Sequence, residues 1–337
     1  MSDFIGRRPV WSLVILIAVA LLAFLIFAVW TPWMELTFGR KRVFLSALFN
    51  GITLGGLYFL VASGFTLIFG LMRNVNLAHG SLYLFGGYVG YSIGNLTNSW
   101  FAALIAAFVI VALAGMLMQV LLFRWMEGQD LRQTLVTIGL SIIVADLLLW
   151  SYGGDTFQVT TPDWLSGPIQ LPFVVALRSD GEAVMMMYPL VRIAILIGAI
   201  ILGVAMWLVL NRTRIGMLVR AGVDDRDMLS ATGVRVQLVF IMVFAFGAGL
   251  AGLAGVVGGT FQSLQPGEDT KILLSSLVVV IVGGMGSIPG AAMGALIVGL
   301  AEQFGSVYMP TYAVMLTFVI MVVVLAIRPQ GLAAVRR

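Results

Sequence analysis

The segment NGITLGGLYFLVASGFTLIFG (residues 50–70) decides the fold class, because it contains no charged residue. A helix needs about 20 apolar residues to cross a bilayer core about 30 Å thick. The polar residues Arg73, Asn74 and Asn76 follow, and a second apolar run begins at residue 77. Long uncharged runs separated by short polar breaks are typical of consecutive membrane-spanning helices.

The composition of the whole chain extends this conclusion. Of 337 residues, 61% are hydrophobic and 10% are charged, whereas soluble domains average about 45–50% apolar and about 25% charged residues. A soluble fold of this length could not bury so much apolar surface. The chain has no cysteine, which excludes disulfides, thiolate metal sites and cysteine nucleophiles. The 39 glycines indicate closely packed membrane helices.

We therefore predict an all-α, polytopic integral membrane protein with about ten transmembrane helices, some of them short or broken. The first run is longer than the apolar core of a signal peptide and is predicted to be a retained helix. The eighth and ninth runs are short and are also compatible with one broken element. The ten predicted spans are residues 10–30, 44–70, 77–95, 100–123, 134–151, 190–210, 237–258, 272–286, 289–306 and 312–327.

The distribution of basic residues predicts that both termini are cytoplasmic. With this orientation, 13 of the 19 basic residues lie in cytoplasmic segments, as the positive-inside rule requires. The cluster Arg40, Lys41 and Arg42 lies on the opposite side and is the main exception. The longest external segment is then residues 152–189.

The longest polar stretch on the predicted inner side is NRTRIGMLVRAGVDDRDMLSATGVR (residues 211–235). Gly216 is predicted to break the preceding helix, and Gly233 to end a short helix. Arginine and aspartate side chains alternate with a modest apolar side. The stretch is either an ordinary solvated loop or a docking helix that presents one face to a cytoplasmic partner.

Small residues recur at helical spacing, which favours close packing of helices. The stretch GGMGSIPG (residues 283–290) goes further, because four glycines and a proline predict an interrupted helix. Irregular backbone at membrane depth is tolerated only inside protein or beside a water-filled cavity. We therefore expect the substrate path to run along this stretch and along residues 76–80.

Three ionisable residues lie within or beside the predicted spans, where each is costly unless it faces a partner or a cavity. His79 follows a polar turn and is interpreted as either a hydrogen-bonded helix cap or a substrate contact. Glu302 either lines the path or reaches interfacial water. Asp146 is expected to pair with an arginine or to cap a broken helix. The predicted substrate-path residues are Asn76, His79, Gly283, Gly284, Gly286 and Glu302.

Catalytic and nucleotide-binding patterns are absent from the sequence. Neither lysine, Lys41 or Lys271, lies in a GxxxxGK[ST] frame, so any ATP must be hydrolysed by another subunit. One histidine cannot form a multi-histidine metal site, and no GxSxG motif occurs. The net charge of +4 reflects membrane topology and not nucleic-acid binding. No catalytic residue, metal site or bound cofactor is predicted.

Four separated blocks of sequence carry a family resemblance: residues 50–90, RAGVDDRDMLSATGV (220–234), FGAGLAGLAGVVGG (246–259) and residues 280–299. They occur in the order found in LivH-type permeases of branched-chain amino acid ABC importers, and the chain resembles that family from about residue 44 to 330. Typical members begin near residue 44. Residues 1–43 are therefore expected to form an extension with one accessory helix, and residues 331–337 a basic tail.

The resemblance implies several partners in the bacterial inner membrane: a second, LivM-like permease, two cytoplasmic ATPase subunits that bind ATP and Mg, and a periplasmic binding protein. Branched-chain amino acids are the implied substrates, although related systems carry other amino acids, amides, urea or aromatic acids. The rival hypotheses are an ion-coupled secondary transporter or channel and a lipid-modifying enzyme. The scarcity of intramembrane acids and the docking-like inner loop argue against the secondary transporter or channel. The absence of a polar catalytic cluster in the sequence argues against the lipid-modifying enzyme. The implied ATPase-coupling residues are Gly216, Arg220, Ala221, Asp224 and Gly233.

Overall fold

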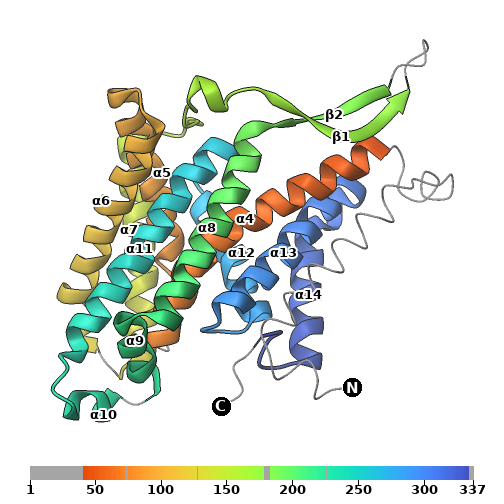
Figure 1. Ribbon diagram of the computed structural model, residues 1–337. Coiled ribbons are helices and arrows are strands. Elements are labelled where there is room, and N and C mark those ends of the chain that lie inside the picture. Colours follow the sequence, from red (N-terminus) through yellow and green to blue (C-terminus); the bar gives the residue numbers. More distant parts are fainter. Residues whose placement is uncertain (1–40, 73–74, 127, 178–182, 225, 334–337) are drawn as a thin grey trace. The chain divides into compact units, whose positions relative to one another are not determined.

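The computed structural model describes residues 41–72, 75–126, 128–177, 183–224 and 226–333. Most of them are helical (Figure 1). The helices are α4 (Lys41–Met72), α5 (His79–Thr97), α6 (Trp100–Leu121), α7 (Asp130–Tyr152), α8 (Leu190–Arg212), α9 (Arg214–Asp224), α10 (Arg226–Ala231), α11 (Val236–Phe261), α12 (Glu268–Gly283), α13 (Ile288–Tyr308) and α14 (Ala313–Ile327). Short 3₁₀ helices are η1 (Phe123–Met126), η2 (Asp163–Leu165) and η3 (Pro310–Tyr312), and the strands are β1 (Pro168–Leu177) and β2 (Ala183–Pro189).

The chain divides into two compact units. Of the described residues, 41–49, 168–177 and 183–189 belong to one unit, and those within 50–167 and 190–333 belong to the other. The predicted span at 10–30 lies outside the described residues, as does nearly all of the predicted extension at 1–43.

In the first unit, β1 and β2 form an antiparallel hairpin in which Pro168 pairs with Pro189 and Ile169 with Tyr188. Phe49 contacts this hairpin: its ring centroid lies 5.6 Å from that of Phe173 and 5.5 Å from that of Tyr188. The hairpin lies in the segment that was expected to be the longest external loop, and the all-α prediction did not include it.

Within the described residues, seven helices are long and apolar enough to cross a membrane. They are α4, α6, α7, α8, α11, α13 and the η3–α14 segment Pro310–Ile327. The all-α, polytopic membrane architecture is thus supported, whereas the expected number of about ten spans is not confirmed. The predicted spans at 77–95 and 272–286 correspond to α5, which is rich in glycine and polar residues, and α12, which has 16 residues.

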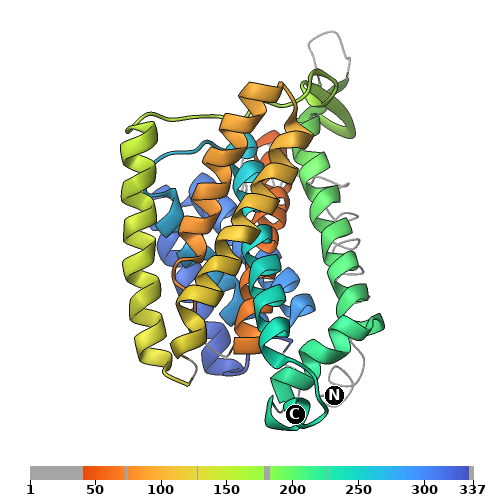
Figure 2. The ribbon, with the colours of Figure 1, turned by 90° about the vertical axis from the view of Figure 1, so that its left-hand side faces the viewer.

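Helices α5, α6 and α11 form the closely packed centre of the second unit and lie side by side (Figure 2). Glycines make this packing possible. A Cβ atom at Gly86 on α5 would collide with the backbone of Gly252 on α11, and one at Gly255 would collide with the carbonyl group of Tyr83. The small-residue stripes seen in the sequence therefore let helix backbones approach closely, as is common in membranes.

Helices α12 and α13 are separate and form an antiparallel hairpin. Gly283 packs against Gly290, and Val279 against Gly294. The connection uses glycines with positive φ, 103° at Gly284 and 81° at Gly286, a conformation that residues with a Cβ rarely adopt. Two separate helices, α12 with 16 residues and α13 with 21 residues, and not one broken element, account for the eighth and ninth runs.

Candidate functional site

The side chains of the polar turn between α4 and α5 pack against α4 and against the turn itself. His79, the first residue of α5, is fully buried; its Nε2 atom lies 3.1 Å from the Val61 carbonyl oxygen on α4. Its ring and that of Phe65 form a T-shaped contact, with centroids 5.3 Å apart. The Oδ1 atom of Asn76 accepts a hydrogen bond of 3.1 Å from the Ala78 N–H group. Both side chains, which were predicted to lie on the substrate path, therefore make contacts within the protein.

The α4–α5 turn also contacts α7. The Leu77 N–H group donates a 3.1 Å hydrogen bond to the Thr137 hydroxyl group. Among the described residues, Nδ1 of His79 and Nδ2 of Asn76 are buried without a hydrogen-bond partner. Such groups are costly to bury, so this turn retains hydrogen-bonding capacity that the described contacts do not use.

The glycine-rich connection at 283–290 is also packed. Gly283 and Gly284 are buried, while Gly286 is exposed beside Gly70. The Ser287 hydroxyl group caps α13 by accepting a hydrogen bond of 3.1 Å from the Gly290 N–H group. Close to the C-terminus, the Ala333 N–H group donates to the Gly283 carbonyl at 3.0 Å. The interruption was predicted correctly, and these contacts give its glycines a packing role.

Glu302 on α13 has a specific partner. The hydroxyl group of Tyr58 on α4 donates a hydrogen bond to its Oε2 atom at 2.5 Å. Tyr58 is fully buried and Glu302 is half-buried. The pair satisfies an acid that would otherwise be costly within a span.

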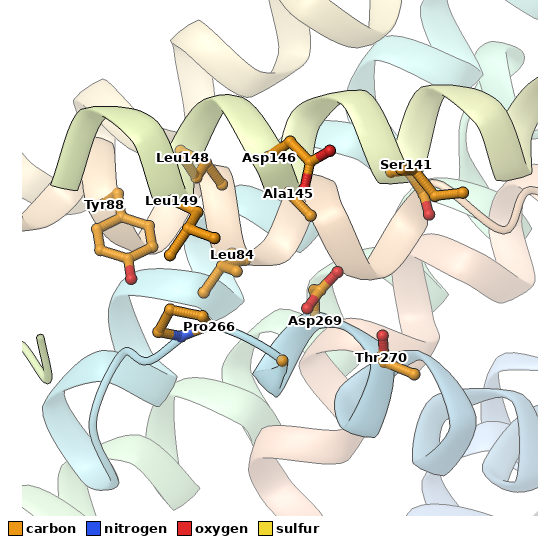
Figure 3. Close-up of a pocket in the computed structure, with 12 residues that line it drawn as sticks. Leu84, Tyr88, Ser141, Ala145, Asp146, Leu148, Leu149, Pro266, Asp269 and Thr270 are labelled. Atoms are coloured by element: carbon orange, nitrogen blue, oxygen red, sulfur yellow. The ribbon is translucent and has the colours of Figure 1, made fainter. Parts of the chain in front are cut away.

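A cavity of about 340 Å³ lies among α5, α7 and the start of α12 (Figure 3). Asp146 on α7 and Asp269 on α12 both line it. Asp146 was singled out in the sequence as an intramembrane acid that pairs with an arginine or caps a broken helix. It lies inside the continuous helix α7 and is exposed, and none of the described residues lining the cavity is an arginine. Asp269 was not singled out, since it begins a short helix and looked like an ordinary first-turn acid.

The predicted coupling segment folds as α9 and α10. Helix α8 ends at Arg212, before Gly216, so the prediction that Gly216 breaks that helix was wrong by one turn. Gly216 instead permits a tight fold-back, since a Cβ there would collide with the backbone of Leu210. The Arg220 guanidinium group donates to the Leu210 carbonyl.

The remaining coupling residues lie at the ends and edges of these helices. Ala221 is half-buried, and Asp224 is the last residue of α9. Gly233 follows α10 with φ 83°, and its N–H group donates to the Ser230 carbonyl at 3.0 Å. Gly233 thus ends the element as predicted.

Helix α9 has a buried face and an exposed face. Val219 is buried with Val239, Phe240 and Val243 of α11. Ile215 and Met217 are 55% and 56% exposed. Exposed apolar side chains on a short helix anchored to longer helices are suited to contact with another protein.

The described residues contain no group of three or more histidine, aspartate or glutamate side chains that could hold a metal ion. The described side chains form contacts between helices, an acidic cavity and a short surface helix. The acidic cavity is suited to binding a small molecule, and the surface helix is suited to transmitting the motion of another protein to the longer helices.

Comparison with known proteins identifies the family. Residues 47–325 match the model of the family described as "Branched-chain amino acid transport system / permease component". The chain is 29% identical over 301 residues to the high-affinity branched-chain amino acid transport system permease protein LivH of Escherichia coli K12, covering 86% of this chain and 95% of LivH.

Two further relatives show the breadth of the similarity. The permease protein BraD of Pseudomonas aeruginosa, from a high-affinity branched-chain amino acid transport system, is 28% identical over 301 residues, again covering 86% of this chain and 95% of the relative. The ribose import permease protein RbsC of Escherichia coli K12 is 25% identical over 280 residues, 76% of each chain. No solved structure matches the chain. The family match spans most of the sequence, and the chain therefore belongs to the family of permease components of branched-chain amino acid transport systems.

Proposed function

We propose that this chain is the membrane-spanning permease subunit of an ATP-driven importer of branched-chain or related amino acids. The observation that carries the proposal is the family match over residues 47–325. The relatives named as branched-chain amino acid permeases align with 86% of this chain. This match favours an importer subunit over an ion-coupled secondary transporter or channel.

The proposed complex contains a second, LivM-like permease, two cytoplasmic ATPase subunits and a periplasmic binding protein. Neither lysine of this chain lies in a P-loop frame. The ATPase subunits are therefore the proposed site of ATP and Mg binding. The complex resides in the bacterial inner membrane, and both termini of this chain are cytoplasmic. The excess of basic residues in the segments assigned to that side supports this orientation.

Helices α9 and α10 are the proposed contact with an ATPase subunit. Val219 anchors α9 to α11, and the Arg220 guanidinium group holds the fold-back at Leu210. A force applied to the exposed side of α9 would therefore reach α8 and α11 directly. ATP-driven motion can change the state of the permease only through such contacts that differ between states.

The substrate path is proposed to pass the α4–α5 turn, the α12–α13 turn and Glu302. The unpartnered Nδ2 atom of Asn76 supports this proposal for the first turn, and exposure of Gly286 supports it for the second. Because the chain has no cysteine, single cysteines at positions 76 and 286 test it. Failure of both to react with small water-soluble thiol reagents, beside a reactive exposed control at Ser166, would exclude this path.

Expression in cells tests the function. The genes next to this one are expected to encode the second permease, two Walker-motif ATPases and a secreted binding protein. Co-expression of all five chains in cells that lack leucine uptake should restore uptake of labelled leucine, and omission of either ATPase should abolish it. Ribose serves as a competitor, given the relative named as a ribose permease. Uptake that persists without the ATPases would support the secondary-transporter hypothesis.

A further inference from the structure

The cavity among α5, α7 and α12 has the size of a small-molecule site. Its volume is about 340 Å³, at the lower end of the range of about 300–1,000 Å³ that is common for ligand pockets. Gly80, which precedes the cavity-lining part of α5, packs against the backbone of Asp269, so the contact between α5 and α12 is close there. The α5–α12 side of the cavity is therefore closely packed, while Ile142, Asp146 and Leu149 on its α7 side are exposed.

The charge of the lining is negative and is not balanced within the cavity. Asp269 is only 7% exposed, and its Oδ2 atom accepts a long hydrogen bond of 3.4 Å from the Ser81 hydroxyl group. Asp146 lies opposite on the membrane-spanning helix α7 (Figure 3). None of the described residues lining the cavity is basic. The side chain of Asp146 is exposed, whereas that of Asp269 is buried. A buried carboxylate requires a positive partner, so the lining around Asp269 is suited to a cationic group.

The other charged groups at the start of α12 are engaged with each other. Lys271 lies 3.6 Å from Glu268, and Gln265 donates to Glu268 at 3.1 Å. Neither Lys271 nor Glu268 lines the cavity. The unmatched negative charge thus belongs to Asp269 and Asp146.

The start of α12 offers hydrogen-bond donors in the same place. Gly267, which precedes the helix, has φ 92° and, as a glycine, supplies no capping side chain. The Glu268 N–H group donates to the Gln265 carbonyl oxygen at 3.3 Å, so the donors considered for a ligand are the N–H groups of Asp269 and Thr270. Gly267, Asp269 and Thr270 all line the cavity. The first N–H groups of a helix have no partners inside it and carry partial positive charge. Helix starts within membrane proteins are used in this way to bind anionic substrate groups.

Apolar side chains complete the lining. Leu84 comes from α5, and Ile142, Ala145, Leu148 and Leu149 come from α7. The cavity therefore combines a site for a cation, a site for an anion and an apolar wall of modest size. A free amino acid with an aliphatic side chain has these three groups on one small frame.

We propose that this cavity is a binding site for the zwitterion of an aliphatic α-amino acid. Asp269, assisted by Asp146, binds the ammonium group, the first turn of α12 binds the carboxylate, and Leu84, Leu148 and Leu149 contact the side chain. The proposal deepens the proposed function and rests on it, since it locates a resting place for substrate within the permease.

Equilibrium binding of labelled leucine to the full-length chain in nanodiscs tests the proposal. The wild-type chain should bind leucine saturably, and Asp269→Asn should weaken binding at least about tenfold, as expected for loss of a charge-assisted hydrogen bond. Asp155→Asn is the matched control, because Asp155 is exposed and lies outside the cavity. Ala145→Trp should block the cavity, whereas Ile143→Trp, on the exposed side of α7, should not.

Competing ligands that lack one charged group test the contribution of each part of the site. Leucine should be displaced weakly by 3-methylbutylamine, which lacks the carboxylate, and not by 4-methylpentanoate, which lacks the amine. Thermal unfolding of each variant shows whether it is folded; if Asp269→Asn does not fold, Ala145→Trp and the competitors decide. No saturable binding to the wild-type chain, wild-type affinity in both cavity variants, or stronger displacement by the carboxylate would overturn the proposal.

The cavity proposal and the importer function are contradicted by different results. If the complete complex imports leucine while both cavity variants bind and transport it normally, the cavity proposal fails and the importer function stands. If the chain binds leucine in the cavity but the complex does not transport it, the importer function fails.

Discussion

The hydroxyl oxygen of Tyr58 on α4 lies 2.5 Å from the Oε2 atom of Glu302 on α13. The bond joins helices that also pack through Gly55 and Gly299. It explains how an acid is accommodated on a membrane-spanning helix: a buried donor meets it from a neighbouring span. Glu302 is therefore part of the interface between α4 and α13.

Removing this donor should destabilise the protein. Tyr58→Phe leaves the carboxyl group of Glu302 without its donor, and we expect a loss of about 1–3 kcal/mol in the free energy of unfolding. Tyr91→Phe is the control, since the Tyr91 hydroxyl group has no hydrogen-bond partner among the described residues. Thermal unfolding in nanodiscs measures the difference. Equal unfolding temperatures for the two variants would show that the Tyr58–Glu302 bond contributes nothing.

The glycine contacts between α5 and α11 give a second prediction. Gly86→Ala places a Cβ atom against the backbone of Gly252, so the helices must separate, at a cost of about 1–3 kcal/mol or more. Gly198→Ala on α8 meets no atom within 4 Å and should leave stability unchanged or slightly higher. A stable Gly86→Ala variant would contradict the close approach of α5 to α11.

His79 is expected to act in stability. His79→Ala removes the hydrogen bond to the Val61 carbonyl and leaves a cavity beside Phe65, with an expected loss of about 2–5 kcal/mol. Unfolding temperature and the KM for leucine uptake are measured on the same preparations. Normal stability together with a raised KM would instead support the substrate contact considered from the sequence.

The exposed side of α9 is expected to determine ATPase coupling. Met217→Glu should weaken co-purification of the ATPase subunits by about tenfold while membrane insertion stays normal, because an unpaired charge would enter an apolar contact. Arg220→Glu should have a larger effect that includes a loss of stability, since Arg220 also holds Leu210. Asn211→Glu is an exposed control at the end of α8. Normal ATPase binding and coupled uptake in Met217→Glu would exclude this face as the contact.

The sequence predicted the helices well where lipid solvation alone determines them. The runs at 100–123, 190–210 and 237–258 differ from α6, α8 and α11 by a few residues, because an uncharged run of that length has few alternatives in a bilayer. The interruption near Gly284 was also predicted, from glycine and proline content.

Features that depend on distant contacts could not be predicted in this way. The pairing of Ile169 with Tyr188 joins segments on either side of the polar residues 178–182, and Pro172 weakens the strand signal of the first. Nor could Asp269 be recognised as cavity-lining, since its neighbours Tyr88 and Asp146 come from other helices. His79 was identified as either a structural or a substrate-binding residue, and only its contact with Val61 favours the structural role.

The most direct test of the central claim is leucine uptake into proteoliposomes that contain this chain with its second permease and both ATPase subunits, supplied with the binding protein. The account predicts uptake only when ATP and Mg are present on the ATPase side and leucine-loaded binding protein on the other, with no response to sodium or proton gradients. Uptake driven by an ion gradient without ATP would contradict it.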